Sequence, residues 1–276
     1  MANSFNIMSV FCEIGGILRG ISPVLRDFKT ICYVEREAYK CEVLASQMEA
    51  GNLDSAPITP YLEKEYREAY NARIHLLAST NPRKNYKHVY ECIRDVRPTW
   101  VFLACRWRKN KDFCRMVMSE LGCLGYETRE GLFSAVEVGA SHRSKRLFIL
   151  GKLARTKCPR LQVPSWASEY LERQEHLTEG VKQCCIIPRD IWGGVPQRIT
   201  DAFPAWPGCG QYDWEAPRTL EPSVGGADDG VSNRLVRPDK TIRNFRIMCM
   251  GNEIVPQQAT LAFMKLMIEM EKEDEL

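Results

Sequence analysis

The sequence has no long apolar segment and no compositional bias that marks an unusual class of protein. No run approaches the roughly 18 apolar residues that a membrane-spanning helix needs. The first residues, which include Asn3 and Asn6, do not form a basic segment leading into an apolar one, as a signal peptide would. The 276 residues include 18 glycines and 15 prolines, an average usage that excludes collagen-like sequence and extended disorder. We therefore expect an intracellular, cytoplasmic protein without a membrane partner.

Metal-binding motifs are also missing, although the chain contains 12 cysteines. Their spacing gives no CxxC pair and no Cys/His set at zinc spacing. We expect reduced thiols used mostly as small core residues, and no metal site. The net charge of +3 is a modest basic excess that permits nucleic-acid binding without requiring it.

Apolar runs alternate with amphipathic stretches in the first half of the chain. The expected strands cover 5–12, 30–34, 74–78, 99–104 and 146–150, and the expected helices cover 17–28, 36–49, 86–96 and 113–124. This alternation predicts a parallel, doubly wound α/β sheet. The pattern is lost from about residue 152 and returns at 245–250, before a helical stretch at 256–270. We therefore predict an α/β domain of residues 1–152 plus 246–276, and a small irregular domain of residues 153–245.

A glycine turn and an acid mark a candidate nucleotide site in this sheet. Gly15 and Gly16 follow the first expected strand, and Glu35 ends the second. Such a turn brings a ligand to the start of a helix, and an acid at the next strand end accepts ribose hydroxyls. The alternative is a tight turn and a surface acid without a ligand.

Five blocks of sequence carry a family resemblance. In chain order they are SVFCEIGGILRG, TICYVEREAYKCEVLASQMEAGNLDSAPIT, RPTWVFL, LGYETREGLFSAVEVGASHRSKRLFILG and MGNEIVPQQATLAF. In this order they resemble the successive motifs of the DNA cytosine-5 methyltransferases, especially the bacterial and phage members. The resemblance implies a Rossmann-like methyltransferase domain that binds S-adenosylmethionine, with residues 153–245 in the place of the small target-recognition domain.

The resemblance also implies a set of cofactor-binding residues, not all of which match the family. Phe11, Gly15, Gly16, Glu35 and Asn252 match the family's cofactor residues. Glu13 stands where the family has glycine, and Pro60 or Tyr61 falls where an adenine-contacting aspartate is expected. These departures predict weakened binding of S-adenosylmethionine.

The catalytic motifs of the family are altered more severely. Its members flip a cytosine out of the duplex, add a cysteine thiolate to the ring and use a glutamate at the ring nitrogen. In this chain Pro82 is followed by Arg83 where the cysteine is expected, and Cys105 lies in the stretch that replaces the glutamate motif. Only Arg146 remains of the family's paired arginines.

Two interpretations of the segment after the TWVFLA run remain open. Cys105 could be a relocated nucleophile whose pKa is lowered by nearby basic residues, or a buried structural cysteine. Those basic residues, Arg106, Arg108, Lys109 and Lys111, could contact DNA phosphates or form a solvated loop. Arg189 and Arg198, in the irregular region, are candidates for a role in sequence preference.

Three functions therefore remain. The first is a catalytically inactive cytosine-5 methyltransferase homologue that binds DNA as a site binder, a shield or a partner of an active enzyme. The second is an active S-adenosylmethionine-dependent enzyme that uses Cys105. The third is a protein-interaction module without nucleic acid.

Overall fold

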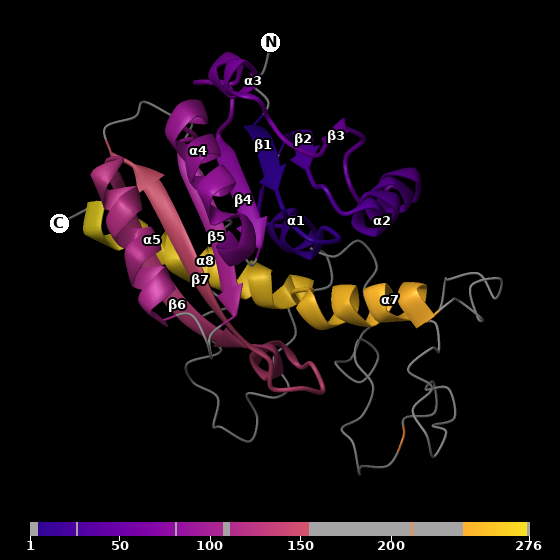
Figure 1. Ribbon diagram of the computed structural model, residues 1–276. Helices are drawn as coiled ribbons and strands as arrows, with labels where there is room; N and C mark the ends of the chain where they lie inside the picture. Colours follow the sequence, from indigo (N-terminus) through magenta and orange to yellow (C-terminus); the bar gives the residue numbers. More distant parts are fainter. Residues whose placement is uncertain are drawn as a thin grey trace.

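A seven-stranded sheet forms the centre of the protein in the computed structural model (Figure 1). The structure describes residues 5–25, 27–80, 82–106, 111–154, 211 and 240–274. The strands are β1 (Phe5–Val10), β2 (Phe28–Val34), β3 (Ile58–Thr59), β4 (Leu76–Thr80), β5 (Trp100–Arg106), β6 (Tyr126–Ser134) and β7 (Lys145–Leu153). Their spatial order is β3-β2-β1-β4-β5-β7-β6. The α/β architecture predicted from the sequence is confirmed.

The prediction of a wholly parallel sheet is wrong. Strands β1 to β5 are parallel, but β7 pairs antiparallel with both β5 and β6. The sequence analysis missed β6, because its exposed and half-buried residues between Glu127 and Leu132 give no continuous apolar run. A hairpin-like pair of long strands therefore closes one edge of the sheet.

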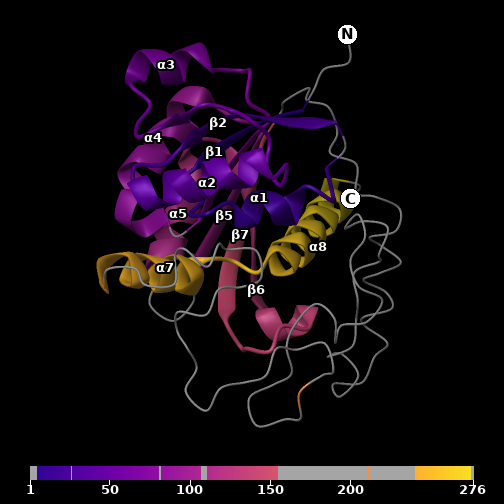
Figure 2. The same cartoon turned by 90° about the vertical axis from the view of Figure 1, so that its right-hand side faces the viewer.

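Helices cover both faces of the sheet (Figure 2). They are α1 (Gly16–Ile21), α2 (Ala38–Glu49), α3 (Lys64–Ala69), α4 (Tyr86–Val96), α5 (Lys111–Cys123), α7 (Lys240–Asn252) and α8 (Pro256–Asp274), with short 3₁₀ turns at Pro82–Asn85 (η1) and Ala135–Val138 (η3). Buried side chains of α1, α2 and α8 form one core cluster with the sheet, and those of α4 and α5 form another. Adjacent strand residues such as Leu76 and Leu77 belong to opposite clusters, which explains why the central strands read as continuous apolar runs.

The last helix packs against the first. The Thr260 hydroxyl of α8 donates a hydrogen bond to the Gly20 carbonyl of α1 (2.6 Å). A methyl group on Gly20 would lie 2.6 Å from the Cβ of Ala259 and would also meet the backbone of Pro256. Glycine is therefore required at this crossing, because any side chain would force the two helices apart.

The strand order places a ligand position at one edge of the sheet. The chain runs outward from β1 through β2 to β3, then crosses back to β4 on the other side of β1. In open α/β sheets the crevice outside the carboxyl ends of the strands, at such a switch point, is where ligands bind. The connection between α7 and α8 lies at this same edge, since Asn252 contacts the end of β5 through Arg106.

The predicted division into two domains is not tested by the structure. Of residues 153–245, only 153, 154, 211 and 240–245 are described, and 240–245 belong to α7. Among the described helices none is long and apolar enough to cross a membrane. In the described ranges we also find no group of three or more side chains that could hold a metal ion.

The crossing of α1 and α8 predicts a glycine effect on stability. We expect Gly20→Ala to lower the free energy of unfolding by about 1–3 kcal/mol, because overpacking outweighs the better helix propensity of alanine. The matched control is Gly122→Ala in α5, where no atom lies within 4 Å of the added methyl group. Chemical denaturation should show Gly122→Ala to be neutral or slightly stabilising, and equal effects of the two changes would contradict this packing.

Candidate functional site

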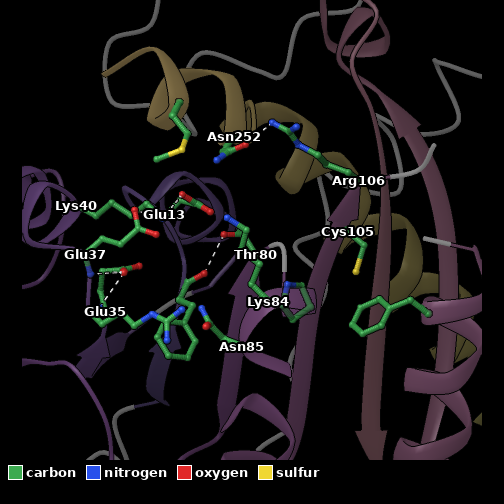
Figure 3. A pocket seen from close by; sticks show the side chains of 15 residues that line it. Glu13, Glu35, Glu37, Lys40, Thr80, Lys84, Asn85, Cys105, Arg106 and Asn252 are labelled. Atoms are coloured by element: carbon green, nitrogen blue, oxygen red, sulfur yellow. Dashed lines mark hydrogen bonds and ion pairs between the residues drawn. The ribbon is translucent and has the colours of Figure 1, made fainter. Parts of the chain in front are cut away.

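A cavity of about 370 Å³ lies at the carboxyl ends of β1, β2, β4 and β5 (Figure 3). Its volume is within the range of small-molecule sites. It is lined by Phe11, Glu13, Glu35, Arg36, Glu37, Lys40, Thr80, Pro82, Lys84, Asn85, Cys105, Arg106, Phe113, Met248 and Asn252. Most of the polar side chains come from strand ends and the turns that follow them, with Lys40 from α2 and Asn252 from the end of α7.

The turn after β1 forms one wall of the cavity in an unusual backbone conformation. Phe11 and Glu13 have φ values of 52° and 55°, and Gly15 has a φ of 96°. Left-handed backbone favours glycine, so two of these three positions carry a side chain at a steric cost. The Phe11 carbonyl accepts a hydrogen bond from the Thr80 hydroxyl (3.1 Å), which ties the turn to the end of β4.

A carboxylate from the far end of the chain holds this turn. The side chain of Glu253 accepts hydrogen bonds from the backbone amides of Ile14 and Gly16, each at 3.0 Å, and from its neighbour Ile254 at 3.0 Å. Burial raises the pKa of Glu253 to about 7, although these amides favour its charged form. A Cβ on Gly16 would collide with this carboxylate and would lie 2.7 Å from the Ile254 carbonyl, which explains the second glycine.

A buried ion pair lies on the cavity side of the same turn. The Lys40 ammonium is 2.8 Å from a carboxylate oxygen of Glu13 and 3.1 Å from one of Glu37. Lys40 and Glu13 are only 6% and 7% exposed. Burial alone would lower the pKa of Lys40, but the contact with Glu13 raises it to about 12. Glu13, at the position where the resemblance implies a glycine, is therefore paired with a buried counter-charge.

Glu35 ends β2 as the sequence predicts and is buried. One carboxylate oxygen accepts hydrogen bonds from the backbone amides of Arg36 (2.9 Å) and Glu37 (3.0 Å). Burial raises the pKa of Glu35, against the opposing effect of those amides and of Lys40. Its second oxygen makes no hydrogen bond to any described residue, so it is an acceptor available to a ligand hydroxyl.

Cys105 lines the opposite side of the cavity and is only 1% exposed. A hydrogen bond with Cys114 of α5 and then burial raise the pKa of the Cys105 thiol, while the charge of Arg146 opposes the shift. Of the two interpretations of Cys105, the described residues favour the buried structural cysteine, because the contact with Cys114 and burial outweigh the charge of Arg146.

The arginines at the end of β5 and the start of β7 bind the connection between α7 and α8. Arg106 donates hydrogen bonds to the Gly251 carbonyl and the Asn252 side chain. Arg146, 2% exposed, donates to the backbone carbonyls of Asn252 and Glu253, both at 2.7 Å. Burial, followed by the charge of Arg106, lowers the pKa of Arg146 to about 10.

The structure brings most of the sequence-predicted site residues together. Phe11, Glu13, Glu35, Cys105, Arg106 and Asn252 line the cavity. Gly15 and Gly16 form the turn behind it, and Arg146 lies beside Asn252. The predicted positions Arg108, Lys109, Arg189 and Arg198 lie outside the described residues, as do the side chains of Arg83 and Lys111.

Sequence reasoning missed Lys40, Glu37 and Glu253. Lys40 and Glu37 are three residues apart at the start of α2, a spacing that places both on one helix face. The sequence therefore contained a signal for this buried ion pair, namely the helical spacing of Glu37 and Lys40 together with the additional acid Glu13. No local pattern could have linked Glu253 to Ile14, since 239 residues separate them.

Comparisons with known proteins identify the fold. The methyltransferase EhMeth of Entamoeba histolytica has 10% sequence identity, with 97% of this chain and 99% of that chain covered and a TM-score of 0.50. The chain has a methyltransferase fold. A Spodoptera frugiperda DNMT2 mutant has 12% identity over 98% of this chain and 99% of that chain, with a TM-score of 0.49.

A third similar structure is a protein encoded within an E. coli prophage and described as a DNA modification methyltransferase. It has 15% identity and a TM-score of 0.44, with 57% of this chain covered. The chain spans 49%, about half, of that protein's length. No protein-family model matches the chain, and no curated protein sequence matches it. The expected Rossmann-like methyltransferase fold is confirmed by the similarity to EhMeth.

The environment of Cys105 predicts low reactivity. With iodoacetamide at pH 7.5 we expect Cys105 to be alkylated at least about tenfold more slowly than the exposed Cys123, because the thiolate is the reactive form. Peptide mass spectrometry of the native and the denatured protein measures both sites in one sample. Equal rates in the native protein would contradict a buried thiol of raised pKa.

Proposed function

We propose that the protein binds DNA through a cytosine-5 methyltransferase fold without transferring a methyl group. The single observation that carries the proposal is the cavity at the carboxyl edge of the sheet. This cavity is lined by Glu35, an acid suited to accept hydrogen bonds from ribose hydroxyls. The only described cysteine that lines it is Cys105, which is buried and hydrogen-bonded to Cys114. The protein would then mark or shield sites, or support an active methyltransferase partner.

The lack of methyl transfer is supported at both positions where the resemblance expects catalytic groups. The chain after β4 reads Pro82-Arg83, and an arginine guanidinium stays protonated and cannot act as a nucleophile. After β5 the acid is replaced by the Ala104-Cys105-Arg106 stretch. Arg146 is engaged with backbone carbonyls of Asn252 and Glu253, which supports a structural role for it.

DNA binding is supported by basic side chains on the same edge. Lys84 and Lys87 follow β4, are exposed, and have no acidic partner among the described residues. Together with Arg36 they line a second cavity of about 370 Å³, which shares Arg36, Lys84 and Asn85 with the first. Exposed lysines on a ligand-binding edge are suited to contacts with phosphates, which position a protein on DNA without reading its sequence.

The salt dependence of DNA binding tests this assignment. For Lys84→Ala/Lys87→Ala we expect the slope of log affinity against log salt to fall by roughly 0.9 for each phosphate contact that the substitutions remove, equally on all duplex sequences. The matched control is Lys29→Ala, an exposed lysine at the amino end of β2, on the opposite edge of the sheet. A salt titration by fluorescence anisotropy measures the slopes.

Two results would count against the proposal in different ways. Equal slopes for the wild type and the Lys84/Lys87 variant would place the DNA surface elsewhere, and Arg108→Ala/Lys109→Ala is the next variant to examine. No binding at low salt would favour a protein-interaction module.

Covalent trapping tests whether the protein forms a bond to the cytosine ring. With 5-fluorocytosine duplex DNA and S-adenosylmethionine we expect no adduct that survives denaturing electrophoresis, because no activated thiolate among the described residues faces the cavity. An active cytosine-5 methyltransferase serves as the positive control. An adduct that forms with the wild type and is lost in Cys105→Ser would establish the enzyme with a relocated nucleophile.

A further inference from the structure

The cavity already contains charged groups of the protein where an amino acid ligand would place its own. S-Adenosylmethionine consists of an adenosine and an amino acid end that carries an ammonium and a carboxylate. An ammonium needs nearby acids, and a carboxylate needs amide or cationic donors. Groups of both kinds are present at the turn after β1, and each is engaged by another part of the chain.

The position for an ammonium is filled by Lys40. Its Nζ lies between the carboxylates of Glu13 (2.8 Å) and Glu37 (3.1 Å), and all three side chains line the cavity (Figure 3). A ligand ammonium that approached these acids would have to displace a buried lysine. If the lysine stayed, two like charges would share one site.

The donors for a carboxylate are filled by Glu253. The amides of Ile14 and Gly16 donate to its two carboxylate oxygens, both at 3.0 Å. These three residues lie behind the cavity wall, and their chain neighbours Glu13 and Asn252 line the cavity. Of the other cations at the cavity, Arg36 donates to the Tyr61 hydroxyl (3.0 Å) and Arg106 to Gly251 and Asn252. Only Lys84, which is exposed, has no such contact in the described structure.

The requirements of a nucleoside, in contrast, are met. The second oxygen of Glu35 can accept a ribose hydroxyl, since both backbone amides bond to the first. Apolar side chains that a planar base could contact line the same cavity, namely Phe11, Phe113 and Met248.

We propose that this cavity binds an uncharged nucleoside and discriminates against nucleosides that carry an amino acid group, because Lys40 and Glu253 take the place of that group. This inference rests on the proposed function in one respect, that the cavity is a cofactor-type site that has lost its transferase role. It makes Lys40 and Glu253 the specificity-determining residues of the site.

A matched pair of ligands tests the inference. Methylthioadenosine and S-adenosylhomocysteine are both adenosine thioethers and differ in the amino acid end alone. By calorimetry on the full chain we expect methylthioadenosine to bind at least about tenfold more tightly than S-adenosylhomocysteine. In Lys40→Met and in Glu253→Ala we expect this ratio to fall by about tenfold or more, through tighter binding of S-adenosylhomocysteine with methylthioadenosine little changed.

Lys29→Met is the matched control, because it removes an equal charge from an exposed position at the amino end of β2, away from the cavity. We expect it to leave the ratio unchanged. Thermal unfolding of each variant establishes that it is folded, and Lys40→Met decides the test if Glu253→Ala does not fold.

Two results would overturn the inference: a wild-type protein that binds S-adenosylhomocysteine as tightly as methylthioadenosine, or one that binds neither. DNA affinity measured on the same sample separates this inference from the proposed function. DNA binding without nucleoside binding would remove the inference alone, and nucleoside preference without DNA binding would remove the proposed function alone.

Discussion

The hydrogen bonds between Glu253 and the turn after β1 are the contact on which the site depends. They join residues that are 239 positions apart and fix both the turn and the connection between α7 and α8. Burying a carboxylate is costly unless it is paired or hydrogen-bonded, and here the backbone amides of Ile14, Gly16 and Ile254 offset that cost. Arg146 then holds the same connection through the carbonyls of Asn252 and Glu253.

This arrangement changes what the cavity can do. Buried charges are tolerated when each has its counter-charge or its hydrogen bonds, and Lys40 has two acids while Glu253 has three amides. Such internally satisfied groups are held in place by one another, so a charged ligand must break protein contacts before it can make its own. The charges of Lys40 and Glu253 are therefore satisfied within the protein, as they would be in a structural core.

Most strands of the sheet and the acid Glu35 after β2 could be predicted, because each depends on a short continuous stretch of sequence. The strand β5 and the helix α4 follow continuous or periodic apolar patterns, and Glu35 directly follows β2. Strand β6 could not be found in this way, because it pairs with β7 at the edge of the sheet and leaves several residues exposed.

The pKa shifts and charge contacts of the site could not be predicted from the sequence, for a different reason. The basic residues near Cys105 suggested a lowered pKa, but whether a charge or burial controls a thiol depends on distances that the sequence does not contain. The contact of Cys105 with Cys114, on the helix that follows, is of this kind. So are the hydrogen bonds of Glu253 with the amides of Ile14 and Gly16, which only the folded chain brings together.

The position of α8 has a consequence for biosynthesis. Its residues Ala262, Phe263, Leu266 and Met267 are buried in the core cluster on the α1 face of the sheet. During translation the strands and α1 leave the ribosome before this helix, so the part of that face which pairs with α8 in the folded protein lacks these contacts until α8 is made. Nascent chains with such exposed surfaces aggregate or bind chaperones. This core cluster is therefore complete only after α8 has left the ribosome.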